Sequence, residues 1–565
     1  MKKLLLTIIL VINILAGSVS GHILENEKDQ TKLEVPDRLL TTQQWNEDLD
    51  FLVSQLKEIH PNIYSKIKEE DFSSLVRSAK LKIAQSNSDI ECYLEIRKVL
   101  SSIQDGHTYL TYKGITNYAS DKLPVKIDCF SDGIFLTAVD SINKSFLGME
   151  VTAIGGIPID IAVQRAMEIS SEDNLSGRKK AALNVFRYPI ILNGLKLSSS
   201  KKGVNLTLRD HNNKSHDLQV STIEDWNDSQ LLSVESLLSD SLPLHLKKRD
   251  RQYWFEYLKD ESTLYFQFNA IGDQGGNEEP LDHFLTRMWQ YLDNHSNEIS
   301  KLIIDIRYNT GGSGRMAIPV VKEIMKRDYI NNSESLFVIT GNKTYSAAVV
   351  MSTALLEFTE AVFIGDAPGC PANLFSNSIV AGKLPNSKHS LSIATRQIDN
   401  AWIDSREYFP IEIPVLFSSN TYFKGEDPAL EAILSGNAEP IWKIAKQNGV
   451  EKALERFNEI NSKYPDLLWW NSSILEPQIN EHGFMAARNY YFKKDETLKE
   501  QFYNESEHLF LLNTKLCPES ASAFQSLGFL YMISGQSDLA ILNYEKSLEL
   551  DPSNSELKAM LEGLK

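Results

Sequence analysis

Ser346 lies in a segment whose residue types suit formation of an acyl-enzyme. It belongs to the run Thr344-Tyr345-Ser346-Ala347-Ala348, between a predicted strand over residues 336–340 and a predicted helix over residues 347–357. A hydroxyl at such a junction projects at the carboxyl edge of a sheet, where the free N–H groups of the helix favour an oxyanion. A serine before a helix is also the common N-cap, so other segments must decide between the two interpretations.

A second polar segment ends the predicted strand over residues 302–306. Its sequence is Asp305-Ile306-Arg307-Tyr308-Asn309-Thr310-Gly311-Gly312. Glycines at a strand end let the backbone pass close to a ligand, and their N–H groups can point into a cavity. The alternative is an ordinary loop with a contact between Asp305 and Arg307.

The third segment, Asp105-Gly106-His107-Thr108, contains a candidate base. A serine nucleophile needs a group that takes its proton, and histidine is the commonest one near neutral pH. Acyl transfer also needs an orienting acid and donors for the oxyanion. An isolated Asp-Gly-His run is otherwise a structural turn, so only the combination of the three segments indicates catalysis.

The ordered set of segments resembles the tricorn-core branch of the C-terminal-processing serine peptidases. That family has an Asp-Gly-His-Thr motif, an Asp-Leu-Arg-x-Asn-x-Gly-Gly motif and a Thr-x-Ser-Ala-Ala or similar motif, in this order, and the resemblance covers residues 42–440. It implies a crotonase-like spiral of α/β units, with Ser346 as nucleophile and His107 as general base. It also implies an oxyanion hole built by the N–H of Ala347 with that of Gly311 or Gly312.

The chain departs from the family at three positions. The processing branch has a lysine about 25 residues after its serine, whereas the first lysine near that distance here is Lys383, so a Ser/Lys dyad is not expected. The tricorn branch has a serine where this chain has Gly106, and an acid near residues 420–422, which are Asn, Thr and Tyr here. The nearby carboxylates Glu426 and Asp427 are therefore the candidate acids for orienting His107.

The elements around these segments divide the chain into regions. Apolar spacing predicts helices over residues 42–59 and 72–103, which form an N-terminal helical cap over 42–118. Short apolar or alternating runs then predict a β-rich segment over 120–215, which resembles a PDZ-like domain around residues 147–156. From residue 250 to 440, strands alternate with helices, which predicts a largely parallel sheet in an α/β catalytic domain.

The last region, residues 441–565, is predicted to be helical. Residues 521–554 match the tetratricopeptide pattern at Phe524, Leu527, Gly528, Tyr531, Ala540, Tyr544, Ser547 and Pro552. Such repeats need stacked neighbours. The segment could bind a protein partner or cap the preceding domain.

The N-terminus has the pattern of a signal peptide over residues 1–20. Lys2 and Lys3 precede an apolar run over residues 4–16, and small residues follow it. We therefore expect export to the periplasm or outside the cell, with no membrane span after cleavage; the alternative is an uncleaved anchor. Export permits disulfides, but the four scattered cysteines are better interpreted as buried free thiols.

Composition excludes some functions for this chain of 565 residues. A formal net charge of -17 argues against a nucleic-acid partner. The histidines form no metal-ligand pair of the H-E-x-x-H type, so neither a metal nor another cofactor is expected. The resemblance thus implies a serine endopeptidase that hydrolyses peptides or unfolded protein tails. The alternative is a catalytically silent protein of the same fold that binds a peptide or another ligand.

Overall fold

The computed structural model describes residues 38–111, 122–223, 227–238, 242–273, 279–401, 406–465 and 467–565. The predicted signal peptide lies outside these residues. Within the described part of the chain, no helix is both long and apolar enough to cross a membrane. In the same residues, no three His, Cys, Asp or Glu side chains form a group that could hold a metal ion.

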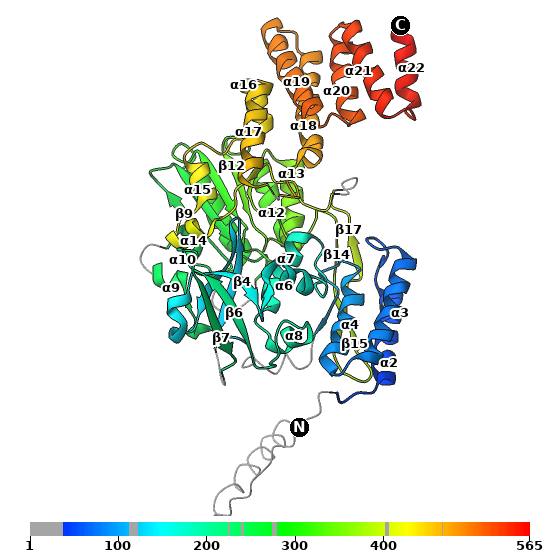
Figure 1. Ribbon diagram of the computed structural model, residues 1–565. Coiled ribbons are helices and arrows are strands. Elements are labelled where there is room, and N and C mark those ends of the chain that lie inside the picture. The colour runs from blue at the N-terminus through cyan, green and yellow to red at the C-terminus, as the bar shows by residue number, and fades with distance from the viewer. Residues whose placement is uncertain are drawn as a thin grey trace, which may run out of the picture. The chain divides into compact units, whose positions relative to one another are not determined.

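A six-stranded sheet forms the centre of the predicted catalytic region (Figure 1). Its strands lie in the order β18-β13-β12-β11-β10-β9, and only β9 runs antiparallel to its neighbour. The continuous apolar runs arise because a sheet covered on both faces buries every side chain. The strands are β9 (Tyr253–Leu258), β10 (Thr263–Phe268), β11 (Lys301–Asp305), β12 (Leu336–Thr340), β13 (Val362–Gly365) and β18 (Ile413–Pro414).

Two hydrophobic cores cover the two faces of this sheet. Alternate residues of a strand point to opposite faces, so Leu264 and Phe266 enter one core and Tyr265 enters the other. The first core holds α11 (Leu281–Asn294), α12 (Gly314–Met325) and α13 (Ala347–Phe358); the second holds α10 (Leu244–Lys247) and α15 (Pro428–Leu434). The predicted alternation of strands and helices around a largely parallel sheet is therefore observed.

The N-terminal helices are α2 (Thr42–Ile59), α3 (Glu69–Gln85) and α4 (Asp89–Ser101). The sequence predicted one helix over residues 72–103, where the structure has two. Strand β1 (Tyr109–Thr111) follows and pairs with β16 (Ser390–Ile393), which also pairs with β15 (Ile379–Lys383). Buried Asp48 of α2 accepts hydrogen bonds from the backbone N–H groups of Asn386 (2.7 Å) and Ser387 (2.8 Å) in the hairpin between β15 and β16.

The β-rich segment contains strands in the order β2-β3-β4-β6-β7 and shares one hydrophobic core with the N-terminal helices. It also contains more helix than the sequence predicted, since α7 and α8 were not expected; α7 has only a few buried apolar side chains and no regular stripe. The elements are β2 (Val125–Phe130), β3 (Gly133–Val139), η2 (Ser141–Phe146), β4 (Glu150–Ile154), β5 (Ile157–Pro158), α6 (Ile159–Met167), α7 (Leu175–Val185), α8 (Pro189–Gly194), β6 (Gly203–Arg209) and β7 (Ser215–Ser221).

Short elements connect these regions. They are η3 (Asp228–Gln230), β8 (Leu232–Ser233), α9 (Val234–Leu238), β14 (Leu374–Ser376), β17 (Arg396–Ile398) and α14 (Ser419–Lys424). Strands β14 and β17 pair with each other in an antiparallel ribbon.

The C-terminal region is helical, as predicted (Figure 1). Gly528 of α20 packs against the Tyr544 ring of α21, where a Cβ would lie 2.6 Å from a ring carbon. This close approach explains why a glycine is needed at that position. The helices are α16 (Ile441–Asn448), α17 (Val450–Lys463), α18 (Ser472–Phe492), α19 (Glu496–Leu516), α20 (Ala521–Ile533), α21 (Ser537–Leu550) and α22 (Ser555–Leu564).

The cysteines only partly match the expectation of buried thiols. Cys92, Cys370 and Cys517 are buried, whereas Cys129 is exposed on β2. Cys129 lies near the end of β2, beyond the buried residues Val125 and Ile127 of the same strand.

Candidate active site

Ser346 directly precedes α13 and has a strained backbone, with φ 54° and ψ −124°. Few residues other than glycine adopt a positive φ, and such strain concentrates at functional sites. The side chain makes no N-cap hydrogen bond to the helix. Its Oγ instead lies 2.9 Å from Nε2 of His107. The ordinary N-cap interpretation therefore does not describe this serine.

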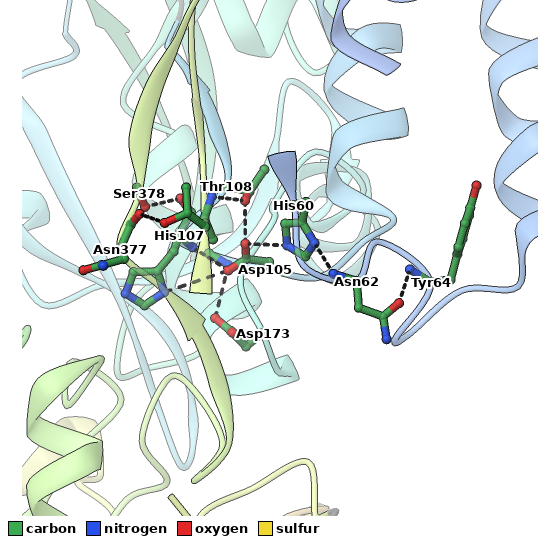
Figure 2. A network of polar contacts seen from close by, with 12 residues as sticks. His60, Asn62, Tyr64, Asp105, His107, Thr108, Asp173, Asn377 and Ser378 are labelled. Carbon is green, nitrogen blue, oxygen red and sulfur yellow. Dashed lines mark hydrogen bonds and ion pairs between the residues drawn. The ribbon is translucent and has the colours of Figure 1, made fainter. Parts of the chain in front are cut away.

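His107 is held by a loop that Asp105 organises (Figure 2). The fully buried Asp105 carboxylate accepts hydrogen bonds from the His107 N–H (2.9 Å) and the Thr108 hydroxyl (2.5 Å), and its Oδ2 lies 3.1 Å from His60 Nε2. Ser378 adds a hydrogen bond from its hydroxyl to the His107 carbonyl at 2.5 Å. The aspartate of the Asp-Gly-His-Thr turn therefore has a structural role, because it fixes the backbone of the histidine.

The second ring nitrogen of His107 faces a tyrosine. Nδ1 lies 3.3 Å from the Tyr345 hydroxyl and 3.9 Å from Asp105 Oδ1. Only the first distance approaches that of a hydrogen bond. The two rings are stacked, with centroids 5.0 Å apart and planes 22° apart. Tyr345 in turn donates a hydrogen bond of 2.7 Å to Asp173.

Burial controls the protonation of these groups. It lowers the pKa of His107, and the charge of Asp105 opposes only part of that effect, so the imidazole is neutral at neutral pH. Burial, with a further contribution from the charge of Asp105, raises the pKa of Asp173 to about 8. Burial also raises the pKa of Tyr345 well above its ordinary value, so this hydroxyl keeps its proton.

The Gly311-Gly312 pair brings the backbone after β11 close to Ser346. Gly311 has φ +106°, and a Cβ there would lie 2.8 Å from the Ser346 Cβ and 3.0 Å from the Ala347 nitrogen. The Gly311 N–H already donates to Asn309 Oδ1 at 2.9 Å. Among the described residues, no acceptor faces the N–H of Gly312 or of Ala347. The free donors beside the serine are therefore those of Gly312 and Ala347, rather than Gly311.

Cys370 and Lys343 lie near the serine without acting as its base. The Cys370 Sγ accepts a hydrogen bond of 3.4 Å from the Ser346 N–H, and burial raises the pKa of this thiol well above its ordinary value. A protonated thiol in this position supports the backbone of Ser346. The Lys343 ammonium lies 5.4 Å from the centroid of the Tyr308 ring instead of contacting Ser346.

The two carboxylates expected to orient His107 contact other groups. Asp427 Oδ2 lies 2.9 Å from His245 Nδ1 and its Oδ1 accepts a hydrogen bond of 3.1 Å from Arg307. Burial raises the pKa of Asp427, but Arg307 and His245 outweigh burial and hold it well below its ordinary value. Glu426 is exposed. Among the contacts of the described residues, neither carboxylate reaches His107, and Asp427 instead contacts Arg307 and His245.

The sequence missed the groups that complete the surroundings of His107. Tyr345 stood inside the nucleophile motif, but nothing in the spacing distinguished it from other residues. Asp173 precedes α7 in the β-rich segment, far from every motif, and the sequence contained no signal for its role. His60 directly follows α2 and reaches Asp105, and the sequence assigned it no role in the site.

Similarity to known proteins is found in the structure and not in the sequence. No protein-family model and no curated protein matches the sequence. A crystal structure of a CPAF mutant matches with TM-score 0.50 and 12% identity, over 70% of this chain and 96% of that chain. Mature CPAF complexed with lactacystin matches with TM-score 0.49 and 13% identity, over 70% and 99%. The tricorn protease matches with TM-score 0.34 and 11% identity, over 70% and 37%.

The structural neighbours thus include CPAF, the tricorn protease and a D1 C-terminal processing protease. The match to the CPAF mutant, with TM-score 0.50 and 12% identity, shows similarity of fold and does not by itself show catalysis. The resemblance predicted from the three motifs is confirmed at this level. The chain has mixed α/β structure and a fold like that of CPAF.

Proposed function

We propose that this chain is an exported serine peptidase that hydrolyses peptides or unfolded protein tails through an acyl-enzyme on Ser346. One observation carries the proposal. A serine with a strained backbone at the start of a helix has its Oγ 2.9 Å from the Nε2 of a buried, neutral histidine. A nucleophile and a base within hydrogen-bond reach are the first requirement of acyl transfer.

The chemistry follows from this arrangement. His107 Nε2 accepts the Ser346 proton while Oγ attacks the substrate carbonyl, and the carbonyl oxygen becomes an oxyanion. The N–H groups of Gly312 and Ala347 stabilise that oxyanion, with a typical contribution of about 3–4 kcal/mol per donor. His107 then gives its proton to the leaving amine as the peptide bond breaks. Water then attacks the carbonyl of the acyl-enzyme while His107 takes a proton from the water. His107 returns this proton to Ser346 Oγ as the acyl group leaves.

A fluorophosphonate probe tests this proposal. We expect the purified mature protein to carry the adduct on Ser346, as mapped by mass spectrometry, and His107→Ala to slow labelling roughly 10²–10⁴-fold. Ser200→Ala, at an exposed position, is the matched control and should label at the wild-type rate. Folded protein that takes up no probe at Ser346 would contradict the peptidase proposal.

One observation favours the second candidate function, a catalytically silent binding protein. The nearest carboxylate oxygen to His107 Nδ1 among the described residues is 3.9 Å away, which is beyond hydrogen-bond distance. Peptide binding without labelling of Ser346 would support this alternative. Isothermal titration with unfolded model peptides measures that binding directly.

The remaining parts of the proposal concern the regions outside the site. We propose that residues 1–20 form a signal peptide, that residues 120–215 form a PDZ-like segment that binds or gates the substrate, and that the α/β spiral spans 250–440. The helices of residues 441–565 are proposed as tetratricopeptide-like repeats that bind a protein partner or cap the catalytic region. Stacked helical repeats create extended concave surfaces, which suit the binding of a polypeptide.

A further inference from the structure

The Tyr345 hydroxyl occupies the space that a side chain on residue 106 would take. A Cβ added to Gly106 would overlap this oxygen and would lie 3.1 Å from Asp173 Oδ2. The Gly106 backbone does not need a glycine, because its φ is not positive. The absence of a side chain at this position therefore has a steric purpose, namely to admit the tyrosine hydroxyl.

We propose that Tyr345 and Asp173 are positioning residues that hold His107 in the tautomer and orientation of a general base. The proposal rests on the peptidase function proposed above and deepens it. It gives Tyr345 and Asp173 the role of orienting His107, for which the sequence had suggested Glu426 or Asp427. Tyr345 acts through His107, and Asp173 acts through Tyr345.

The hydrogen bonds form a chain with one productive direction. His107 Nε2 accepts the Ser346 proton only when the single ring proton is on Nδ1. That Nδ1–H donates toward the Tyr345 oxygen at 3.3 Å, and the Tyr345 hydroxyl donates to Asp173 Oδ2 at 2.7 Å. Asp173 Oδ2 also accepts the Gly106 N–H at 3.2 Å. Every donor in this direction has an acceptor.

The opposite direction disables the base. If Tyr345 donates its proton to Nδ1, the ring proton lies on Nε2, which then cannot take a proton from Ser346. An ionised Asp173 prevents this reversal, because it competes for the tyrosine proton as an acceptor. A protonated Asp173 can donate to the tyrosine oxygen and so permits the reversal.

Asp105 does not replace this chain. Its oxygens already face three donors, which are the His107 N–H, the Thr108 hydroxyl and His60 Nε2 (Figure 2). Its Oδ1 is 0.6 Å farther from Nδ1 than the tyrosine oxygen, at 3.9 Å against 3.3 Å. Asp105 contributes its charge and holds the loop, while Tyr345 makes the nearer contact to the ring.

The surroundings of Asp173 give the chain a pH dependence. The groups that act on this carboxylate are Tyr345, the Gly106 N–H, and the titratable side chains of Asp105, Glu172 and Cys370. Burial and the charge of Asp105 raise its pKa to about 8, while burial lowers the pKa of His107. The reactivity of Ser346 should therefore rise with pH through about 8, when His107 is already neutral.

The first experiment measures the rate of fluorophosphonate labelling of Ser346 between pH 6 and 9.5. We expect Tyr345→Phe and Asp173→Asn to label roughly 10²-fold more slowly than wild type at pH 9 and to lose the rise around pH 8. Tyr544→Phe, which removes a hydroxyl from a buried tyrosine of α21, is the matched control and should keep the wild-type profile. Wild-type rates and profiles in both site variants would overturn the proposal.

A double-mutant cycle tests the steric part of the argument. Gly106→Ala should displace the tyrosine hydroxyl and reduce the labelling rate about as much as Tyr345→Phe. In the Tyr345→Phe background the same change should cause little further loss, because both changes act through one hydroxyl. If the fold-losses in labelling rate of the two single variants multiply in the double variant, the two changes act independently, which would contradict the inference.

The tautomer of His107 separates this inference from the proposed function. In protein with ¹⁵N-labelled histidine, NMR at pH 9 should find the ring proton on Nδ1 in the wild type and a shift toward Nε2 in Tyr345→Phe. Wild-type protein that does not react with the probe would overturn the peptidase function, and the tautomer would still decide the role of Tyr345. The same tautomer in both proteins would overturn the positioning role even if the wild type reacts.

Discussion

At the scale of single residues, the site combines strain with costly burial. Ser346 adopts a positive φ, and Asp173 is a buried carboxylate whose pKa is raised to about 8. Both features disfavour the folded state and are tolerated where they serve chemistry. Each therefore makes a prediction about stability that is independent of activity.

The strain at Ser346 predicts an unusual effect of glycine. Glycine normally destabilises a protein relative to alanine, because the unfolded chain gains freedom. At φ 54° and ψ −124° the order should reverse, with Ser346→Gly more stable than Ser346→Ala by about 1 kcal/mol. Urea denaturation of the two variants measures this difference. A less stable glycine variant would show that the backbone of Ser346 is not strained.

The raised pKa of Asp173 predicts that its removal stabilises the protein at high pH. Its pKa is about 8 in the folded state against an ordinary 3.8, so the folded protein binds the proton more tightly than the unfolded chain. The cost to stability begins above the unfolded pKa and grows until the pH passes the folded pKa. Asp173→Asn should therefore gain stability relative to wild type from pH 5 to pH 9, as measured by urea midpoints.

Asp228 is the matched control, because its pKa shift and the expected effect on stability have the opposite sign to those of Asp173. The hydrogen bond from Arg187 lowers its pKa, so its stabilising effect is present above its unfolded pKa and is lost as the pH falls through the lower folded value. Asp228→Asn should lose stability at pH 7 and lose less at low pH. The same sign for both variants would contradict these assignments.

At the scale of elements, the site is assembled by two strand ends and one turn. The chain after β11 supplies Gly311 and Gly312, the chain after β12 supplies Ser346, and the turn between α4 and β1 supplies His107. Parallel neighbours β11 and β12 end at the same edge of the sheet, which brings the glycines to the serine. Ligands of open α/β sheets characteristically bind at this edge.

The close packing of the β11 loop predicts a sharp effect of a single methyl group. Gly311→Ala would place a Cβ 2.8 Å from the Ser346 Cβ at φ +106°, so we expect a loss of roughly 1–3 kcal/mol in stability and slower labelling of Ser346. Gly314→Ala, at the start of α12, meets its nearest atom at 3.9 Å and should be neutral or stabilising. Equal effects in thermal unfolding and labelling would contradict the role of Gly311.

At the scale of the whole molecule, the C-terminal helices belong to two different cores. Side chains from the segment of α16 to α19, such as Trp442, Trp470 and Leu509, share a core with the six-stranded sheet. Most of the side chains in the second cluster belong to α20 to α22, such as Leu530, Tyr544 and Leu561. The helical region is therefore partly integral to the region of the six-stranded sheet and partly an extension of it.

This division predicts different results for two truncations. A chain that ends after residue 519 loses α20 to α22 but keeps the core of the sheet, so it should stay folded and label at Ser346. A chain that ends after residue 440 exposes the apolar face that α16 to α19 cover and should aggregate. Size-exclusion chromatography and probe labelling distinguish these outcomes. A soluble, reactive chain of 440 residues would show that these helices are dispensable for folding.

Local patterns were sufficient for much of the fold. The strands β11 and β12 and the helix α13 were predicted to within one residue at each end, because continuous apolar runs report burial directly. Helices α7 and α8 were not predicted, since a helix with few apolar side chains leaves a weak pattern. The sequence also identified Ser346 and His107 as candidates, because motif order and strand-to-helix context are local properties.

The sequence by itself thus determined the class of fold, the candidate nucleophile and the candidate base. Only the tertiary structure decided what faces the other nitrogen of His107. Tyr345 and Asp173 are 172 residues apart and meet because Gly106 leaves room between them. Asp427 was as plausible by type, but its burial beside Arg307 and His245 commits it elsewhere. A carboxylate's role depends on which charges it is buried with, and that is settled by packing across the whole chain.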